Sequence, residues 1–388
     1  MYSSGGALRK KKVKLVLDYE GILCNPALDF AWYSYKNLVS KETKEKFPED
    51  LIKIFDEYDD VRWEREREMV GHSTGTTPLV CDCAAAYDDI SDHELISLAQ
   101  SSVQENPGVN NLIQFAQEKL ETLYIVTNSY PALALTTSYK YEIPSTNVFT
   151  HGYQLPRKEL DKLKRVTNDW RLMDMGGDND VSLNDMSLKA EAMRRSPIES
   201  LKPKEELEVF LNKYLENCSN LLQAYNAEDN GTITSLKKNE LKLFEKVKDR
   251  DLRKALKYIF LHEKAIMGGH RKVDVLKTID LYGEGIVYLG DSIVDADAIR
   301  FSKYGFAVNC TNKHSLYDAK LNLVLSDFSA LIPLLEDISE GKFEFNEAKN
   351  YENSDMKVFL PSEIKQNFDY VKSINNEFKQ ELKRMYKN

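Results

Sequence analysis

The chain has 388 residues, of which 42% are hydrophobic and 30% charged, and its formal net charge is −9 at pH 7. This length predicts two or three domains, and the negative charge argues against nucleic-acid binding, because a phosphate backbone would be repelled. The sequence has no apolar run of about 18 residues, so no membrane partner is expected, and its start lacks the apolar segment of a signal peptide. Five cysteines without a disulfide-scaffold spacing favour a reducing, cytoplasmic location.

The first 150 residues predict a helical segment placed between strands of a parallel sheet. Residues 13–18 are β-branched and aliphatic, as expected of a buried strand. Residues 29–105 follow a helical pattern, in which Ser91 and Glu94 resemble a capping box. Pro107-Gly108 predicts a turn, and the next elements are expected over 109–119 (helix), 123–126 (strand), 131–141 (helix) and 147–150 (strand). This alternation predicts parallel strands joined by right-handed crossovers.

The rest of the chain predicts a charged helical insertion and then a return to the sheet. Residues 156–261 are charged and mostly helical in pattern, with a loop at 175–180. The following elements are expected over 273–279 (helix), 286–289 (strand), 295–301 (helix), 306–309 (strand) and 323–325 (a last short strand). Residues 362–387 carry an amphipathic pattern, which predicts a C-terminal helix that packs on its own core or forms an oligomer contact.

Together these elements predict an α/β fold with a Rossmann-like parallel sheet core, a helical cap domain and a second helical insertion. The core is expected over 12–28, 106–155 and 262–340, the cap over 29–105, the insertion over 156–261 and a helical tail over 341–388. Because ligands of such open sheets gather at the carboxyl ends of the strands, the functional residues are expected there.

Separated stretches of the chain supply groups suited to phosphoryl transfer. Asp18, Thr127 and Asp291 each follow a predicted strand, so these three side chains are expected at one edge of the sheet. Lys272 starts a helical run, and Asp295 follows Asp291 closely. A carboxylate nucleophile, a hydroxyl, an ammonium group and a second set of carboxylates are what Mg²⁺-assisted attack on a phosphate requires.

The same stretches resemble the motifs of the haloacid dehalogenase superfamily, specifically its Mg²⁺-dependent phosphatases. The resemblance is carried by Asp18-Tyr19-Glu20-Gly21-Ile22-Leu23, Thr127, Lys272 and Gly290-Asp291-Ser292-Ile293-Val294-Asp295, the last being the most specific. The layout is nearest to the phosphoserine-phosphatase-like branch, and it also resembles a poorly characterised archaeal group of such hydrolases. Residues 29–105 look like the first-type cap of the family, whereas the insertion at 156–261 is unlike small phosphoserine phosphatases.

The resemblance implies a role for each site residue. Asp18 would attack phosphorus and form an aspartyl-phosphate. The groups implied to hold the transferring phosphate are Thr127, Asn128 and Lys272. The implied ligands of Mg²⁺ are Asp18, the backbone carbonyl of Glu20, Asp291 and Asp295. For Asp295 a second role is open, in which it orients Lys272 or a metal-bound water.

Glu20 is the departure from the family pattern, which has Asp two residues after the nucleophile as the catalytic acid and base. Glu offers the same chemistry with one more methylene, which displaces the carboxylate by roughly 1 Å and slows a position-sensitive step by about a hundredfold if nothing compensates. Glu20 is therefore either a repositioned acid and base, or the mark of an enzyme that is slow, specialised for transfer, or inactive.

The sequence therefore predicts Mg²⁺-dependent hydrolysis of a small phosphorylated metabolite, with homodimer formation left open. The alternative is a regulatory or assembly subunit that keeps the fold with weakened chemistry. Carbon–halogen hydrolysis is disfavoured, because it needs no metal and would leave Asp291 and Asp295 unexplained.

Three further patterns are interpreted as structural. Cys81-Asp82-Cys83 fits no common zinc spacing. Residues 226–234 mimic the start of an EF-hand loop, but Lys237 stands where the bidentate acid belongs. The alternating charges of the first helical segment predict a solvated helix face for Arg62, Arg65 and Arg67. The alternative is that these arginines contact a substrate anion from the cap.

Overall fold

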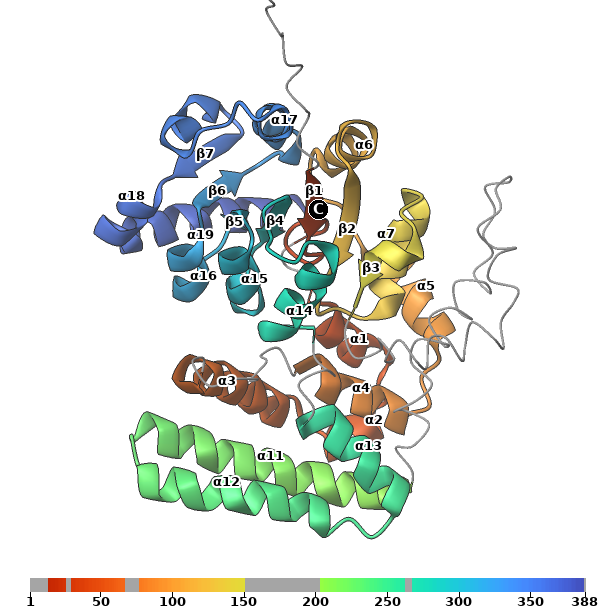
Figure 1. The fold of residues 1–388 in the computed structure, drawn as a ribbon. Coiled ribbons are helices and arrows are strands. Elements are labelled where there is room, and N and C mark those ends of the chain that lie inside the picture. The colour runs from red at the N-terminus through yellow and green to blue at the C-terminus, as the bar shows by residue number, and fades with distance from the viewer. Residues whose placement is uncertain (1–12, 26–28, 67–76, 151–202, 262–266, 387–388) are drawn as a thin grey trace, which may run out of the picture.

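The computed structural model describes residues 13–25, 29–66, 77–150, 203–261 and 267–386 (Figure 1). The loop predicted at 175–180, and all other predictions that fall on residues 151–202, lie outside the described residues. Within the described ranges, no helix combines the length and the apolar character needed to cross a membrane.

A mostly parallel sheet of seven strands forms the centre of the described core. Its strands are β1 (Lys14–Leu17), β2 (Thr122–Val126), β3 (Val148–Phe149), β4 (Ile286–Gly290), β5 (Tyr304–Val308), β6 (Leu321–Leu325) and β7 (Met356–Phe359). They lie in the order β3-β2-β1-β4-β5-β6-β7. Strands β1 to β6 pair in parallel, and β7 pairs antiparallel with β6. The predicted α/β fold with a Rossmann-like parallel sheet is confirmed. The order in which successive strands are added to the sheet changes direction between β1 and β4.

Helices cover both faces of the sheet, which explains why the strands read as continuous apolar runs. Leu15 and Leu17 pack into the core of one face, whereas Val16 packs into the core of the other. The helices that share the first core include α6 (Val109–Lys119), α7 (Pro131–Lys140) and α17 (Ile332–Glu340). Those that share the second are α14 (His270–Ile279), α15 (Ala296–Phe301), α16 (Lys313–Asp318), α18 (Pro361–Gln366) and α19 (Phe368–Met385).

Two separated segments of the chain form one helical body beside the sheet. The first holds α1 (Phe30–Leu38), α2 (Lys41–Lys46), α3 (Glu49–Glu66), α4 (Thr77–Tyr87) and α5 (Asp92–Ser102), and the second holds α11 (Lys204–Asn226), α12 (Asn230–Glu245) and α13 (Arg250–Leu261). The capping box predicted for Ser91 and Glu94 opens α5. The Phe55 ring on α3 lies 6.0 Å from the Tyr214 ring on α11. The predicted cap and insertion therefore pack against each other.

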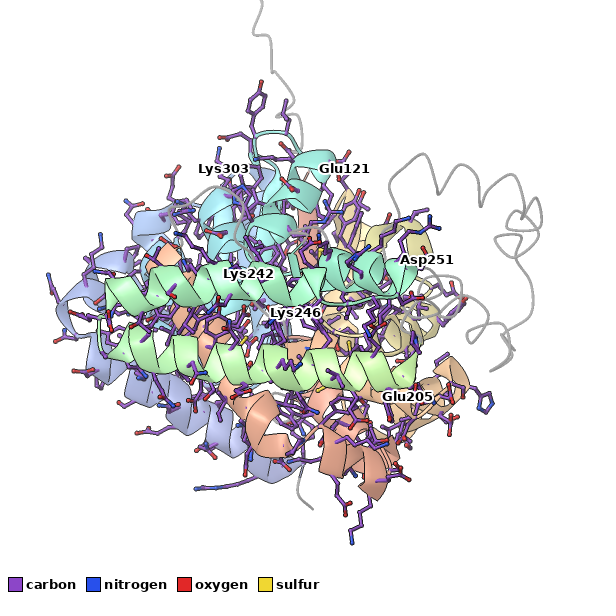
Figure 2. The ribbon with its side chains drawn as sticks, turned by 90° about the horizontal axis from the view of Figure 1, so that it is seen from below. Glu121, Glu205, Lys242, Lys246, Asp251 and Lys303 are labelled. Atoms are coloured by element: carbon purple, nitrogen blue, oxygen red, sulfur yellow. The ribbon has the colours of Figure 1, made fainter. Side chains whose placement is uncertain are left out.

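Figure 1 shows this helical body on one side of the sheet, with α3 and α11 stacked in successive layers. Figure 2, seen from below, shows α11 and α12 lying side by side across the molecule, with Glu205 near the start of α11 and Lys242 near the end of α12. The body covers the side of the core from which the chain leaves β1 toward α1.

The sheet continues into the region that was predicted as a helical tail. Strand β7 pairs with β6 through Leu323 and Val358, so the prediction that 323–325 is the last strand is wrong. Helices α18 and α19 follow β7. Asn375 on α19 is fully buried and donates from Nδ2 to Asn322 Oδ1 over 2.8 Å. The prediction that the C-terminal helix packs on its own core is confirmed.

Candidate active site

The predicted site residues Asp18, Thr127 and Asp291 stand at the carboxyl ends of three adjacent strands. Asp18 follows β1, Thr127 follows β2 and Asp291 follows β4. Strand β1 lies between the other two, with Leu17 opposite both Ile125 and Leu289. The three residues therefore lie where the strand order changes direction, which is the position at which open α/β sheets bind ligands.

Lys272 joins this edge from helix α14 and binds two of the aspartates. Its Nζ lies 2.9 Å from Asp18 Oδ2 and 2.6 Å from Asp295 Oδ1, and its side chain is fully buried. Burial alone would lower the pKa of Lys272, but the charges of Asp18 and Asp295 outweigh it and raise that pKa. Burial, with Asp295 next in effect, raises the pKa of Asp18 well above its ordinary value, although Lys272 opposes the shift. The two carboxylates therefore favour the charged form of Lys272.

Both carboxylate oxygens of Asp295 are saturated with hydrogen bonds. Oδ1 accepts from Lys272 Nζ and from the Tyr288 hydroxyl, both over 2.6 Å. Oδ2 accepts from the Asp291 and Ser292 backbone N–H groups and from the Ser292 hydroxyl, over 3.1, 3.1 and 2.9 Å. Although burial opposes it, Lys272 and these bonds lower the pKa of Asp295. This environment favours the orienting role for Asp295 over that of a direct metal ligand.

Two glycines of the predicted motifs allow the carboxylates to approach the backbone. Gly21 has a φ of +82°, and a Cβ there would lie 2.3 Å from Asp291 Oδ2. A Cβ on Gly290 would lie 2.4 Å from Asp295 Cγ. Both contacts are far below van der Waals distance, so any side chain at either position would displace an aspartate of the cluster.

Asp18, Asp291 and Asp295 form a potential metal site among the described residues. One carboxylate oxygen from each lies within 4.8 Å of the others. Burial raises the pKa of Asp291 above its ordinary value, and the nearby Lys379 partly offsets this effect. Carboxylate oxygens are the ligands that Mg²⁺ prefers, and a divalent cation would relieve the repulsion among these buried charges. The donor set therefore fits the predicted metal.

Glu20 connects the site with the helical body. Its Oε1 accepts from the Phe30 backbone N–H at the start of α1 over 2.7 Å and from the Ser129 hydroxyl over 3.2 Å. Burial, and then the charge of Asp29, raise the pKa of Glu20 well above its ordinary value. A raised pKa favours the protonated form of a carboxyl group, which is the form that a general acid needs.

Thr127 and Asn128 are less directly joined to the cluster than the aspartates. The Ser129 backbone N–H donates to Thr127 Oγ1 over 3.1 Å, so Ser129 links Thr127 to Glu20. Asn128 Oδ1 accepts from the Met267 N–H over 3.2 Å, which ties β2 to the segment before α14. Ser129 was not among the predicted residues, although its place directly after Asn128 was a usable signal.

The cysteine, EF-hand-like and arginine patterns of the sequence lie outside the carboxylate cluster. Cys81 and Cys83 are buried side chains of α4. The EF-hand mimic is the start of helix α12, capped by Asp229, and not a calcium loop. The prediction of a solvated position is wrong for Arg62, whose Nη1 lies 3.6 Å from the buried Glu240 Oε1, because the partner comes from a distant segment. Arg65 pairs with Glu228 on the surface, as predicted, and Arg67 lies outside the described residues.

Comparisons with known proteins support the architecture alone. No family model and no curated protein matches the chain. The chain is similar to a solved structure, the gene product AF1437 from Archaeoglobus fulgidus, with a TM-score of 0.61 and 14% sequence identity. The likeness covers 96% of this chain and 97% of that chain, so it extends over the core and the helical body together.

Proposed function

We propose that this protein is a Mg²⁺-dependent phosphatase of the haloacid dehalogenase type, which hydrolyses a small phosphomonoester through an aspartyl-phosphate on Asp18. The observation that carries the proposal is the buried cluster of Asp18, Asp291, Asp295 and Lys272 at the strand ends. Burying several charges costs stability, because each loses its hydration. Such clusters in a ligand-binding position are typical of active sites.

In the proposed reaction, a carboxylate oxygen of Asp18 attacks phosphorus and the bond from phosphorus to the leaving oxygen breaks. Glu20 gives its proton to the leaving oxygen and then takes one from the water that hydrolyses the aspartyl-phosphate. Lys272 holds Asp18 in place and offsets its negative charge. The helical body, which reaches Glu20 through Phe30, would keep bulk water from the intermediate.

The metal would be held by Asp18 and Asp291, with the Glu20 backbone carbonyl as a further oxygen donor. When bound, Mg²⁺ supplies positive charge to the oxygens of the transferring phosphoryl group. Asp295 would act through Lys272 and the backbone N–H groups that it binds. Thr127 and Asn128 remain the proposed phosphate contacts from β2.

Turnover of an aryl phosphate with Mg²⁺ tests the proposal directly. Asp18→Asn should lower turnover by at least about a thousandfold, which corresponds to roughly 4 kcal/mol of barrier, while the urea unfolding curve still shows a folded protein. Asp274→Asn is the matched control, because Asp274 lies on α14 with Lys272 but is 45% exposed. Turnover of Asp18→Asn within about tenfold of the wild type would falsify the assignment of the nucleophile.

A regulatory or assembly subunit is the second candidate, and one contact favours it. Lys379 Nζ lies 2.9 Å from Asp291 Oδ2, so an ammonium group already binds a carboxylate of the proposed metal site. A protein of this kind would show no Mg²⁺-dependent turnover of any phosphomonoester in the wild type. A screen of phosphorylated metabolites therefore separates the two candidates and, for an enzyme, also identifies the substrate class.

A further inference from the structure

Helix α19 brings a second lysine to the carboxylate cluster. Lys379 Nζ donates to Asp291 Oδ2 over 2.9 Å, although the two residues are 88 positions apart. Its side chain is 20% exposed and that of Asp291 is 10% exposed. Among the described residues, the Asp291 side chain accepts a single hydrogen bond, and Lys379 is its donor. No resemblance or motif in the sequence pointed to this residue.

The surroundings of α19 hold Lys379 in this position. One turn before it, the fully buried Asn375 exchanges hydrogen bonds with the side chain of Asn322 on β6. Beyond it, Leu382 is buried, and the Tyr386 hydroxyl donates to Asn106 Oδ1 over 2.9 Å. The helix is therefore fixed on both sides of Lys379, and the ammonium group is presented to the site and not left free in solvent.

Asn106 extends this attachment to the loop that carries Glu20. Its Nδ2 lies within 3.1 Å of the backbone carbonyls of Gly21, Ile22 and Cys24. Helix α19 thus contacts the site twice, directly at Asp291 and indirectly, through Asn106, at the loop after β1. A change in the position of α19 would be felt at both places.

An ammonium group and a divalent cation make competing demands on Asp291. Mg²⁺ binds carboxylate oxygens at about 2.1 Å, and Lys379 is within hydrogen-bond distance of the same carboxylate. Two cations this close repel each other, and the repulsion is strong where water is largely excluded. We propose that Lys379 competes with the divalent metal ion for Asp291, so that α19 sets the affinity of the site for metal. This inference rests on the metal site of the proposed function.

Isothermal titration of Mg²⁺ into the wild type and three variants tests the competition. Lys379→Gln should bind Mg²⁺ at least about tenfold more tightly than the wild type, a gain of about 1.4 kcal/mol. Lys379→Arg keeps the charge and should bind like the wild type. Lys372→Gln removes an exposed lysine of the same helix and should also leave the dissociation constant unchanged.

Unchanged or weaker binding in Lys379→Gln overturns the inference, since Lys379 would then be neutral toward the metal or would help to position Asp291 for it. Absence of binding in both proteins overturns it as well. Binding that is detected in Lys379→Gln but not in the wild type supports it most strongly. Turnover is measured separately from Mg²⁺ affinity. If the protein shows this shift in affinity but no phosphatase activity, the proposed function is contradicted and the proposed competition is supported.

A second measurement needs no variant of Lys379. The wild type is acetylated with limiting acetic anhydride, with and without saturating Mg²⁺, and the modified lysines are quantified by mass spectrometry. Mg²⁺ should speed the acetylation of Lys379, because its amine is released from Asp291, and leave that of Lys372 unchanged. A rate at Lys379 that stays the same or falls contradicts the competition.

Discussion

Lys272 and Lys379 bind different carboxylates of one cluster, and their surroundings differ. Lys272 is fully buried and bridges Asp18 and Asp295, whereas Lys379 is partly exposed and binds Asp291 alone. Lys272 lies on α14 and Lys379 on α19, which follows the last strand, and both helices pack into the second core. The contrast supports the proposal that Lys272 is a fixed part of the cluster whereas Lys379 exchanges with the metal ion.

Removing each lysine is the strongest test of this contrast. Lys272→Met should lower the free energy of unfolding by about 3–5 kcal/mol, because Asp18 and Asp295 would be left buried without their counter-ion. Lys379→Met should cost about 1 kcal/mol, because Asp291 keeps some access to solvent. Urea unfolding with EDTA present measures both. Equal losses for the two variants would remove the distinction.

Glu20 extends the comparison to a carboxyl group held by neutral donors. Because Glu20 is the proposed acid and base, Glu20→Gln should slow hydrolysis of the aspartyl-phosphate by about a hundredfold, roughly 2.7 kcal/mol. Its formation from an activated aryl ester should change little, since a good leaving group needs no proton. Radiolabelled phosphate should accumulate on the protein in single-turnover experiments. Equal dephosphorylation rates in wild type and variant would restrict Glu20 to capping α1.

Variants of Asp291 and Asp295 distinguish a ligand of the metal ion from a residue that orients Lys272. Asp291→Asn should weaken Mg²⁺ binding by at least about tenfold, or about 1.4 kcal/mol, because a ligand is lost. Asp295→Asn should weaken it less and destabilise the fold more, because five hydrogen bonds depend on its carboxylate. Calorimetric titration and urea unfolding of both variants provide the measurements. A larger loss of affinity in Asp295→Asn would make it the metal ligand.

The pH dependence of stability gives the smallest expected effect. The raised pKa of Asp18 means that the folded state binds more protons than the unfolded state above the ordinary value of 3.8, so stability falls as pH rises toward neutral. With EDTA the loss between pH 5.5 and 7.5 should be on the order of 1 kcal/mol more in the wild type than in Asp18→Asn. Saturating Mg²⁺ should reduce that difference. An identical pH slope in both proteins contradicts the assigned direction.

The strands and the aspartates were predictable because their signals are local. Short aliphatic runs marked β1, β2 and β4, and each run ended in a polar residue of the site. Strand β7 has only four residues, one of them the exposed Lys357, and pairs antiparallel at the sheet edge. Such a segment carries little periodicity, so its pairing with β6 was not visible in the sequence.

Contacts between residues far apart in the chain could not be predicted from the sequence. Arg62 belongs to a run of alternating charges, and its neighbours in the sequence do not indicate that it forms an ion pair with Glu240 on α12. Lys379 is likewise one of several lysines on an amphipathic helix, and its neighbours in sequence do not distinguish it. Its contact with Asp291 depends on how α19 packs into the second core, which local sequence does not reveal.

The assembly of the cluster also fixes an order of events during synthesis. Asp18 is translated 254 residues before Lys272. It is translated 361 residues before Lys379, since 379 − 18 = 361. At about 5–20 residues per second, roughly 20–70 s separate Asp18 from Lys379. Contacts of such separation also form slowly once the chain is complete. The nascent chain therefore carries Asp18 through most of its elongation without Lys379, which lies after β7 and is the last charged group of the cluster to be translated.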